Sequence, residues 1–305
     1  MLLDKLLSNL SVHVKPFAIC TLSEGWRLHL PGPPGVLFHF VLEGNGVIYG
    51  PRSDAHPIAP LHLSVVPAGA KHILECSGDF RDELKIDTSP SGEQVCHIIA
   101  GSSERADLVV GCGIVSVRYG PSLDLFDYLH DVLAVDLSSV PQALPAFQGI
   151  LAEQSQAIAG SDAMTAALMT QCLVHFFRRL PSQGEGALPW LMALQDERLG
   201  RVIDMILDDP GTEYTVESMA DTAAMSRSAF AEHFVESFGR SPMSFVNHVR
   251  MQRAAQLLTI GNISNISIDE IARTVGYSSR SHFSRAFKDH SGLPPKDFRA
   301  KSFSQ

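Results

Sequence analysis

One helical unit occurs twice near the C-terminus, and this repeat constrains the fold more than any other feature of the sequence. Residues 215–250 are echoed by residues 267–301, with an offset of 52 at the first matching pair and 53 afterwards. The matching positions are Ala220/Ala272, Ser226/Ser279, Phe230/Phe283, Phe234/Phe287, Gly239/Gly292, Pro242/Pro295 and Phe245/Phe298. The extra residue of the second copy is expected in its turn.

Each copy reads as two helices joined by a tight turn, followed by the start of a third. The expected N-caps are hydroxyl residues, at Thr215, Ser226, Ser267 and Ser279. In each second helix, two Phe residues four positions apart predict one buried face. A Gly then ends that helix, and a Pro sits early in the next one. This order predicts a helix-turn-helix with a polar, exposed second helix.

The charge of this region favours a DNA-binding surface over a helical scaffold. Residues 226–301 carry eleven Lys/Arg and six Asp/Glu, although the whole chain has a net charge of −9. Several of the basic residues fall on the second helix of the second copy. A local excess of positive charge is the electrostatic requirement for binding phosphates.

The stretch 198–301 resembles the DNA-binding domain of AraC/XylS-type transcription regulators. The second copy carries the signature I-A-x-x-V-G-Y-S-x-x-S-x-F-x-R-x-F-K followed by G-x-x-P-x-x-F-R, from Ile271 to Arg299. The first copy fits with R-x-x-x-A-x-x-L-L from Arg250 to Leu258. The resemblance implies a double helix-turn-helix that binds double-stranded DNA, and activation by contact with RNA polymerase.

The expected DNA contacts lie on the exposed faces of the two second helices. The candidates are Arg227, Ser228 and Glu232 in the first copy, and Arg280, Ser281, His282, Ser284, Arg285 and Lys288 in the second. Arg285 matches a base-reading position of the family, and Arg most often reads guanine. Glu232, at the equivalent place, either accepts from cytosine or repels phosphate. The helix joining the copies, about 242–260, would span roughly 28 Å, close to the spacing of successive major-groove segments.

The N-terminal part of the chain reads as a separate, acidic, all-β domain. Residues 1–196 carry 11 basic and 20 acidic side chains, which argues against DNA contact there. Between residues 16 and 118, short β-branched or aromatic runs alternate with Gly/Pro/Ser/Asp turns, as in a sandwich or small barrel. We therefore expect a multi-domain chain, with an all-β domain and helical hairpin before an all-α double helix-turn-helix.

Residues 16–125 resemble a cupin jelly roll. His39-Phe-Val-Leu-Glu-Gly-Asn-Gly, followed by Pro67-x-Gly-x-x-His72, carries the resemblance. Enzymatic cupins hold a metal with an H-x-H…E…H set, but Val41 stands where the second His is expected. Glu43 and His72 remain, so a complete metalloenzyme site is not predicted. A cupin-type metalloenzyme with an attached DNA-binding domain, and a DNA-binding scaffold without sequence preference, are the alternative functions.

Four ligand-type residues are expected at the mouth or in the interior of the barrel: Cys20, His39, His72 and Cys112. Two His with one or two thiolates would suit Zn²⁺, the one cofactor that the residues suggest. The same residues could form a thiol pair that responds to an oxidant. They could also be ordinary buried side chains, or line a pocket for a small organic effector. The sequence leaves these alternatives open.

The remaining segments complete the expected organisation. We divide the chain into a sensor domain at 1–125, a helical dimerisation segment at 126–180, a flexible linker at 181–195 and the DNA-binding domain at 196–305. Helicity is expected from residue 122 onward, including Leu133, with longer helices at about 143–159 and 162–180 and Ser161 as an N-cap. The apolar second helix suits either core packing or a homodimer interface.

The sequence also predicts where the protein works. Five cysteines without C-x-x-C spacing do not suggest a disulfide framework, so a reducing cytoplasm is expected. We identify neither a signal peptide nor a membrane span. The function that all these features favour is a cytoplasmic, sequence-specific transcription regulator, an activator by family resemblance, controlled by a signal sensed in its N-terminal domain.

Overall fold

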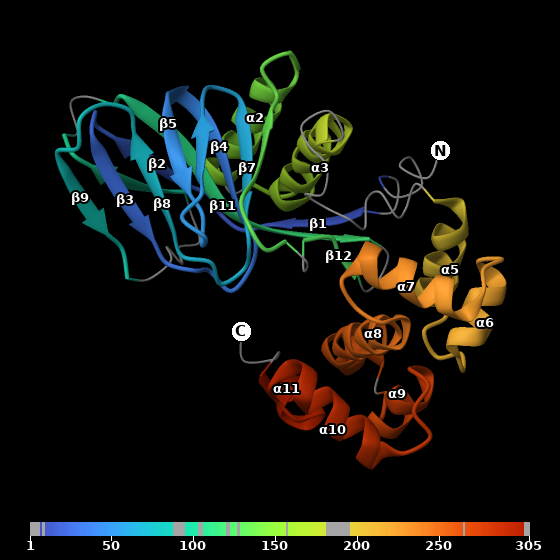
Figure 1. The fold of residues 1–305 in the computed structure, drawn as a ribbon. Coiled ribbons are helices and arrows are strands. Elements are labelled where there is room, and N and C mark those ends of the chain that lie inside the picture. The colour runs from blue at the N-terminus through green and yellow to red at the C-terminus, as the bar shows by residue number, and fades with distance from the viewer. Residues whose placement is uncertain are drawn as a thin grey trace. The chain divides into compact units, whose positions relative to one another are not determined.

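The computed structural model describes residues 7, 10–87, 95–102, 106–119, 123–126, 129–156, 158–180, 196–264 and 266–301. The chain forms two compact units. Residues 10–117 and 125–187 make up the β unit, and residues 188–305 with 1–9 and 118–124 make up the helical unit. Figure 1 shows the strands of the first and the helices of the second. The expected linker at 181–195 lies outside the described residues.

The β unit is built on two sheets (Figure 1). The larger sheet has the order β10-β2-β11-β4-β7-β13, and β1 and β12 also pair with β11. Its strands are β1 (Leu10–Val14), β2 (Ala18–Leu22), β4 (Leu37–Gly44), β7 (His62–Val66), β10 (Cys96–Ala100), β11 (Leu108–Tyr119), β12 (Leu123–Asp124) and β13 (Leu133–Asp136). The smaller sheet has the order β6-β5-β8-β3-β9. Its strands are β3 (Trp26–Leu30), β5 (Gly46–Tyr49), β6 (Ala55–Ile58), β8 (His72–Cys76) and β9 (Asp82–Lys85).

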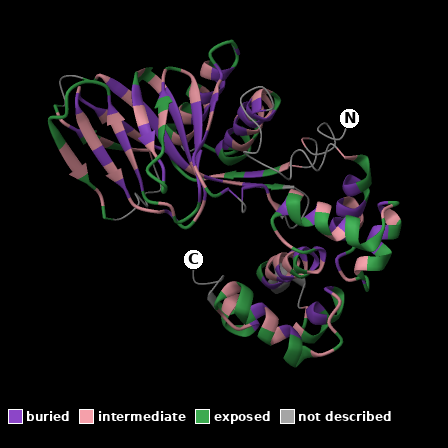
Figure 2. Ribbon diagram, in the orientation of Figure 1, coloured by how far each residue is buried: buried purple, intermediate pink, exposed green. Residues whose placement is uncertain are grey.

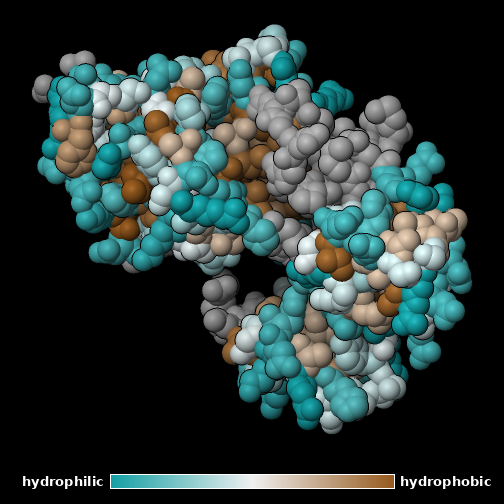
Figure 3. Space-filling view, in the orientation of Figure 1, coloured by the Kyte–Doolittle hydropathy of each residue, from teal (hydrophilic) through white to brown (hydrophobic). Residues whose placement is uncertain are grey.

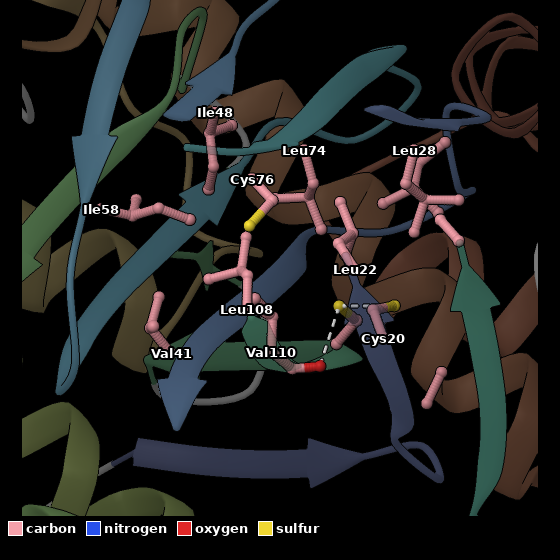
Figure 4. Packing of buried hydrophobic residues seen from close by; sticks show 14 of the residues in the cluster. Cys20, Leu22, Leu28, Val41, Ile48, Ile58, Leu74, Cys76, Leu108 and Val110 are labelled. Atoms are coloured by element: carbon pink, nitrogen blue, oxygen red, sulfur yellow. Dashed lines mark hydrogen bonds between the residues drawn. The ribbon is translucent and has the colours of Figure 1, made fainter. Parts of the chain in front are cut away.

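Alternating side chains of both sheets form the core of the β unit. Burial alternates strictly along β2 and β8, as it must when every second side chain of a strand points to the same face. Figure 4 shows how Leu22, Leu74 and Val110 from different strands gather around Cys20. Each such aliphatic side chain contributes about 1.5–3 kcal/mol when it is removed from water. The predicted all-β domain is therefore confirmed.

Two helices, α2 (Ala143–Gln156) and α3 (Ser161–Arg179), pack against each other and follow the strands in the same unit. The expected helicity from residue 122 to Leu133 is wrong, because Leu123–Asp124 already form strand β12. Residues Leu133–Asp136 form strand β13, which pairs antiparallel with β7 and buries Leu133 and Val135. Ser161 is also not the N-cap of α3: Gly160 takes that position with φ 92°, and the Ser161 hydroxyl donates to Glu153 instead.

The helical unit follows the repeat. Its helices are α5 (Glu197–Asp208), α6 (Val216–Thr222), α7 (Arg227–Phe238), α8 (Pro242–Ser264), α9 (Ile268–Thr274), α10 (Arg280–Ser291) and α11 (Pro295–Lys301). Helices α6 and α7 form the first helix-turn-helix, and α9 and α10 form the second. Helix α8 joins the two and extends to Ser264, four residues beyond the expected end. Among the described residues, no helix is long and apolar enough to span a membrane.

Local signals in the sequence account for the helix ends. Thr215 accepts a hydrogen bond from the backbone N–H of Ser218, and Ser267 accepts one from Glu270. Three of the four expected caps make this side-chain bond; Ser279 occupies the N-cap position without it. Gly239 and Gly292 end α7 and α10 in the left-handed conformation, at φ 66° and 76°, which favours glycine. Figure 2 shows buried and exposed residues alternating along these helices.

A candidate DNA-binding surface and a buried thiol–imidazole array

Helix α10 presents a polar face because its apolar face is anchored. Phe283 and Phe287 are fully buried and pack with α8 and α9 residues in the core of the second helix-turn-helix. The expected contact residues on the same helix are exposed at Ser281, His282, Arg285 and Lys288, and Ser284 is half-buried. The face is therefore polar and basic, as direct contact with a groove requires. Most of the α10 and α11 surface in view in Figure 3 is hydrophilic.

Arg280, the first residue of α10, is engaged with an acidic neighbour. Its guanidinium donates to the Asp269 carboxylate of α9 across 2.9 Å. The two side chains are 56% and 51% exposed, so water screens the pair and it contributes little to stability. A phosphate could therefore replace the carboxylate as the partner of Arg280.

Helix α7 has a different surface. Phe230, Phe234 and Phe238 are buried, while the expected contact residues Arg227, Ser228 and Glu232 are exposed. His233 lies toward the N-terminus of α5, with its Nε2 3.4 Å from the Asp196 carboxylate. The Arg198 guanidinium beside Asp196 holds the pKa of that carboxyl at about 2. Helix α7, the first recognition helix, carries one exposed cation, Arg227, among its described residues.

Arg250 of α8 joins the loop between α5 and α6 to the turn of the second helix-turn-helix, a role that the sequence motif did not reveal. Its Nε donates to the carbonyl of Pro210 at 2.8 Å, and a terminal nitrogen donates to the carbonyl of Thr212 at 2.9 Å. The same guanidinium lies over the Tyr277 ring in the turn of the second unit, 5.9 Å from its centroid. A Cβ at Gly276 would come within 2.6 Å of the Gly211 carbonyl oxygen, so glycine permits this close approach.

In the β unit, the four ligand-type residues come together as expected. Cys20 lies on β2, His39 on β4, His72 on β8 and Cys112 on β11. All four are buried, with exposures of 0%, 0%, 3% and 6%. They form a row: Cys20 Sγ is 3.1 Å from Cys112 Sγ, Cys112 Sγ is 3.0 Å from His39 Nδ1, and His39 Nε2 is 2.8 Å from His72 Nε2. We call this row the thiol–imidazole array; Figure 4 draws its sulfur–sulfur contact at Cys20.

Two glycines explain how β11 presents Cys112 to this array. A Cβ at Gly111 would meet the Phe147 ring at 2.4 Å, and one at Gly113 would meet the Phe17 ring at 2.7 Å. The glycines therefore let aromatic rings pack on one face of β11. Because neighbouring side chains in a strand point to opposite faces, Cys112 between them points into the sheet-to-sheet core. Cys112 pairs across the sheet with His39.

The hydrogen-bond chain assigns the tautomers of the two imidazoles. His72 Nδ1 lies 3.2 Å from the carbonyl oxygen of Ala70, and a carbonyl only accepts, so this nitrogen carries the hydrogen. His72 Nε2 is then an acceptor, and His39 Nε2–H donates to it. His39 Nδ1 is left as an acceptor facing the Cys112 thiol. This assignment follows from the partners of each nitrogen.

Burial shifts the pKa values of His39, His72 and Cys112 toward their uncharged forms. Desolvation, and next the neighbouring His72, lower the pKa of His39 well below its usual value. Desolvation likewise lowers the pKa of His72 to about 4. Desolvation, and next the hydrogen bond with Cys20, raise the pKa of the Cys112 thiol well above its usual value. A proton that leaves Cys112 therefore needs an acceptor in contact with it, and His39 Nδ1 is placed there.

The row does not fit a zinc ion held by all four residues. The two ring nitrogens of His39 face opposite neighbours, whereas a tetrahedral site needs its donors to converge on one point. Within the parts of the chain that the structure describes, no group of three or more His, Cys, Asp or Glu is arranged to hold a metal. Val41 is packed in the core, and Glu43 is exposed at the strand end. The donor set of enzymatic cupins is therefore not assembled around His39.

Both parts of the chain are similar to known protein families. A family model described as "Cupin" matches residues 2–181, and one described as "Helix-turn-helix domain" matches residues 219–301. The "HTH-type transcriptional regulator MtrA" of Neisseria gonorrhoeae is 26% identical over 98% of this chain and 97% of its own length. The "RCS-specific HTH-type transcriptional activator RclR" of Escherichia coli is 25% identical over 92% of this chain and 91% of its own.

One solved structure to which part of the chain is similar contains DNA. It is the DNA-binding domain of AdpA in complex with a target DNA, 28% identical, covering 34% of this chain and 92% of that one with a TM-score of 0.33. The matches to the two family models and to relatives of the same length agree with the residues described above. The chain belongs to the cupin family through its N-terminal part and is an AraC-type helix-turn-helix transcriptional regulator.

Proposed function

We propose that this regulator binds its operator with both recognition helices and that oxidation of the Cys20–Cys112 thiol pair controls this binding. The observation that carries the proposal is the array itself: two buried thiols 3.1 Å apart, with an imidazole acceptor 3.0 Å from one of them. The description of RclR as an RCS-specific activator supports a defined chemical signal in one relative. Activation through RNA polymerase, a homodimeric state and a cytoplasmic location belong to the same proposal.

The proposed DNA contacts are of two kinds, to base edges and to phosphates. Arg285 on α10 reads a base edge, while Arg280 and Lys288 contact phosphates and fix the register. Arg227 and Ser228 on α7 position the first unit against a second groove segment. Helix α8 has 23 residues, so it spans about 35 Å at 1.5 Å per residue, near the 34–36 Å between successive half-sites. One chain can then occupy two groove segments.

In the β unit, the proposed reaction is a two-electron oxidation by a peroxide. The Cys112 sulfur attacks one peroxide oxygen and becomes a sulfenic acid, and the leaving oxygen departs as water with the proton that His39 Nδ1 had accepted from the thiol. The Cys20 sulfur then attacks the Cys112 sulfur and forms the disulfide. The Cys20 proton leaves with the displaced oxygen as a second water. Two thiols and one peroxide give one disulfide and two waters.

Disulfide formation would change the fold because it moves strands. The two sulfurs must approach from 3.1 Å to about 2 Å, and we propose that β2 and β11, which carry them, shift as the bond forms. Oxidation can then favour one of two conformational states that bind DNA with different affinity. The change in DNA affinity is limited by the difference in DNA-binding free energy between those two states. The proposal assigns no substrate turnover to the cupin domain, since Val41 and the exposed Glu43 leave the enzymatic donor set incomplete.

The test combines peptide mass mapping with DNA binding. Purified protein is treated with stoichiometric hydrogen peroxide, and its affinity for DNA from upstream of its own gene is measured before and after. We expect a Cys20–Cys112 disulfide and an altered affinity, both lost in Cys20→Ser and Cys112→Ser. Cys172→Ser is the matched control, because Cys172 is buried in α3 outside the array. A disulfide without any change in DNA binding would refute the control mechanism.

A further inference from the structure

Helix α7 carries an exposed apolar side chain on a mostly polar surface. Val235 is 43% exposed, and among the described residues it is the one large hydrophobic side chain exposed on a recognition helix. Ala231, one helical turn earlier, is half-buried beside it. We call Ala231 and Val235 the apolar patch. Single exposed apolar residues are common in folded proteins, so the meaning of the patch depends on where it lies.

The internal repeat places the patch on the face of α7 that corresponds to the expected DNA-contact face of α10. With the offset of 53, Ala231 and Val235 match Ser284 and Lys288. Both helices are anchored by the same buried Phe pair, so matching residues occupy the same rotational positions. Where α10 offers a hydroxyl and an ammonium group, α7 therefore offers two apolar side chains. The two helices cannot contact DNA by the same chemistry at these positions.

The packing of α7 agrees with this assignment of faces. Residues two apart on a helix are separated by about 200° of rotation, so His233 points away from both members of the patch. The Nε2 atom of His233 lies 3.4 Å from the carboxylate of Asp196, the N-cap of α5. The side of α7 that carries the patch is therefore not the side that α5 approaches.

An apolar side chain in the major groove has one favourable partner. The C5-methyl group of thymine is apolar, whereas the other groups on the base edges donate or accept hydrogen bonds. A valine that covered a donor or an acceptor would leave it buried without a partner, which costs free energy. Valine also has no group that binds phosphate. The chemistry of the patch therefore selects thymine.

We propose that Val235, together with Ala231, contacts the C5-methyl group of a thymine in the half of the operator that α7 binds. This contact makes Val235 a specificity-determining residue, with a preference for thymine that α10 does not have at the matching position. The inference rests on the proposed binding of both recognition helices to the operator. It is independent of the thiol–imidazole array.

Replacing thymine with uracil tests the contact, because uracil lacks the methyl group and keeps every hydrogen-bonding group. Footprinting of the reduced full-length protein defines the operator in DNA from upstream of its own gene, and Arg285→Ala marks the half that α10 contacts. Each thymine of the other half is then replaced singly, and the affinity is measured by fluorescence anisotropy. We expect one replacement to weaken binding about four-fold, the effect of removing one buried methyl group.

Variants of α7 assign this effect to the patch. In Val235→Ala, DNA with thymine and DNA with uracil should bind with nearly equal affinity, and the coupling between the protein change and the DNA change isolates the contact. Val235→Ile keeps a large apolar side chain and should keep the discrimination. Glu236→Ala is the matched control, since Glu236 is exposed on α7 outside the patch. Because Val235 is exposed, its variants should unfold at nearly the wild-type temperature.

The inference is overturned if the half bound by α7 contains no thymine at which uracil weakens binding. It is also overturned if the uracil effect persists unchanged in Val235→Ala. Changes of whole base pairs in the same half check the proposed function separately. If those changes alter the affinity while uracil does not, only this inference fails. If neither has an effect, α7 does not contact the operator, and the proposed binding by both helices fails as well.

Discussion

His39 Nδ1 faces the Cys112 sulfur at 3.0 Å and is an acceptor, because the other ring nitrogen donates to His72. The imidazole is therefore the acceptor in contact with a thiol whose pKa is raised by burial. The two residues are direct partners across β4 and β11, so their geometry is fixed by the sheet register.

The first prediction concerns His39→Gln. Gln keeps a hydrogen-bond acceptor but is not a base, so the substitution should slow oxidation of Cys112 by peroxide by about 100-fold, the lower range for general base catalysis. In the wild type the rate should keep rising above pH 9, because burial raises the pKa of Cys112 above its usual value. Stopped-flow thiol titration from pH 6 to 10 checks both. A purely structural role would lower stability without changing the pH profile, and urea unfolding of the reduced variant measures that loss of stability.

The second prediction is an acid weakness of the β unit. Burial lowers the pKa of His72 to about 4 in the folded protein, below its ordinary value of about 6.5, so the unfolded chain binds a proton first as pH falls. Its contribution to stability is fully present above pH 6.5 and is lost as pH falls toward 4, an effect of about 3 kcal/mol. Urea unfolding at pH 7 and pH 4.5 measures the loss. In His72→Gln the loss should be smaller, and an unchanged difference would contradict the assignment.

The third prediction concerns Arg285→Ala on α10. Loss of a bidentate base contact should weaken operator binding by about 1–3 kcal/mol and relax the preference at one base pair. Arg273→Ala on α9, also exposed but off the recognition helix, should leave the base preference intact. Binding to a library of operators with single base changes separates the two. An unaltered preference profile in Arg285→Ala would exclude base reading.

The fourth prediction concerns the ion pair of Arg280 with Asp269. Asp269→Asn removes a carboxylate that competes with phosphate for the guanidinium, so DNA affinity should rise several-fold at low salt. Arg280→Ala should reduce the slope of affinity against salt by about one charge without changing base preference. Fluorescence anisotropy across a salt series measures the DNA affinity of Asp269→Asn and the salt dependence of DNA binding by Arg280→Ala. If Asp269→Asn weakens binding, the carboxylate orients Arg280 rather than competing for it.

Most of the helical unit could be predicted because its signals are local. Gly239 and Gly292 end their helices through their own backbone freedom, and Thr215 and Ser267 cap theirs through bonds three residues away. The role of Arg250 could not be predicted, since its carbonyl partners are about 40 residues earlier in the chain.

In the β unit, the sequence predicts which residues lie in the barrel but not how they are ordered there. The gathering of Cys20, His39, His72 and Cys112 followed from the cupin resemblance, but their order along the row depends on how two sheets face each other. Because the four residues form a row and their donor atoms do not converge on one point, they do not suit zinc coordination by all four. Leu133 was expected in a helix because its apolar neighbours allow one; the strand form exists because β7 offers a free edge.

The contacts of Arg250 have a consequence for the DNA rather than for the protein. Its guanidinium bonds to Pro210 and Thr212 in the loop that leads into the first helix-turn-helix, and it lies over Tyr277 in the turn of the second. In the proposed complex, inserting five base pairs between the two halves of the operator turns one half to the far side of the duplex, while inserting ten restores its face but not its distance. A new binding site for this regulator must then contain both halves at one spacing and on one face of the DNA helix.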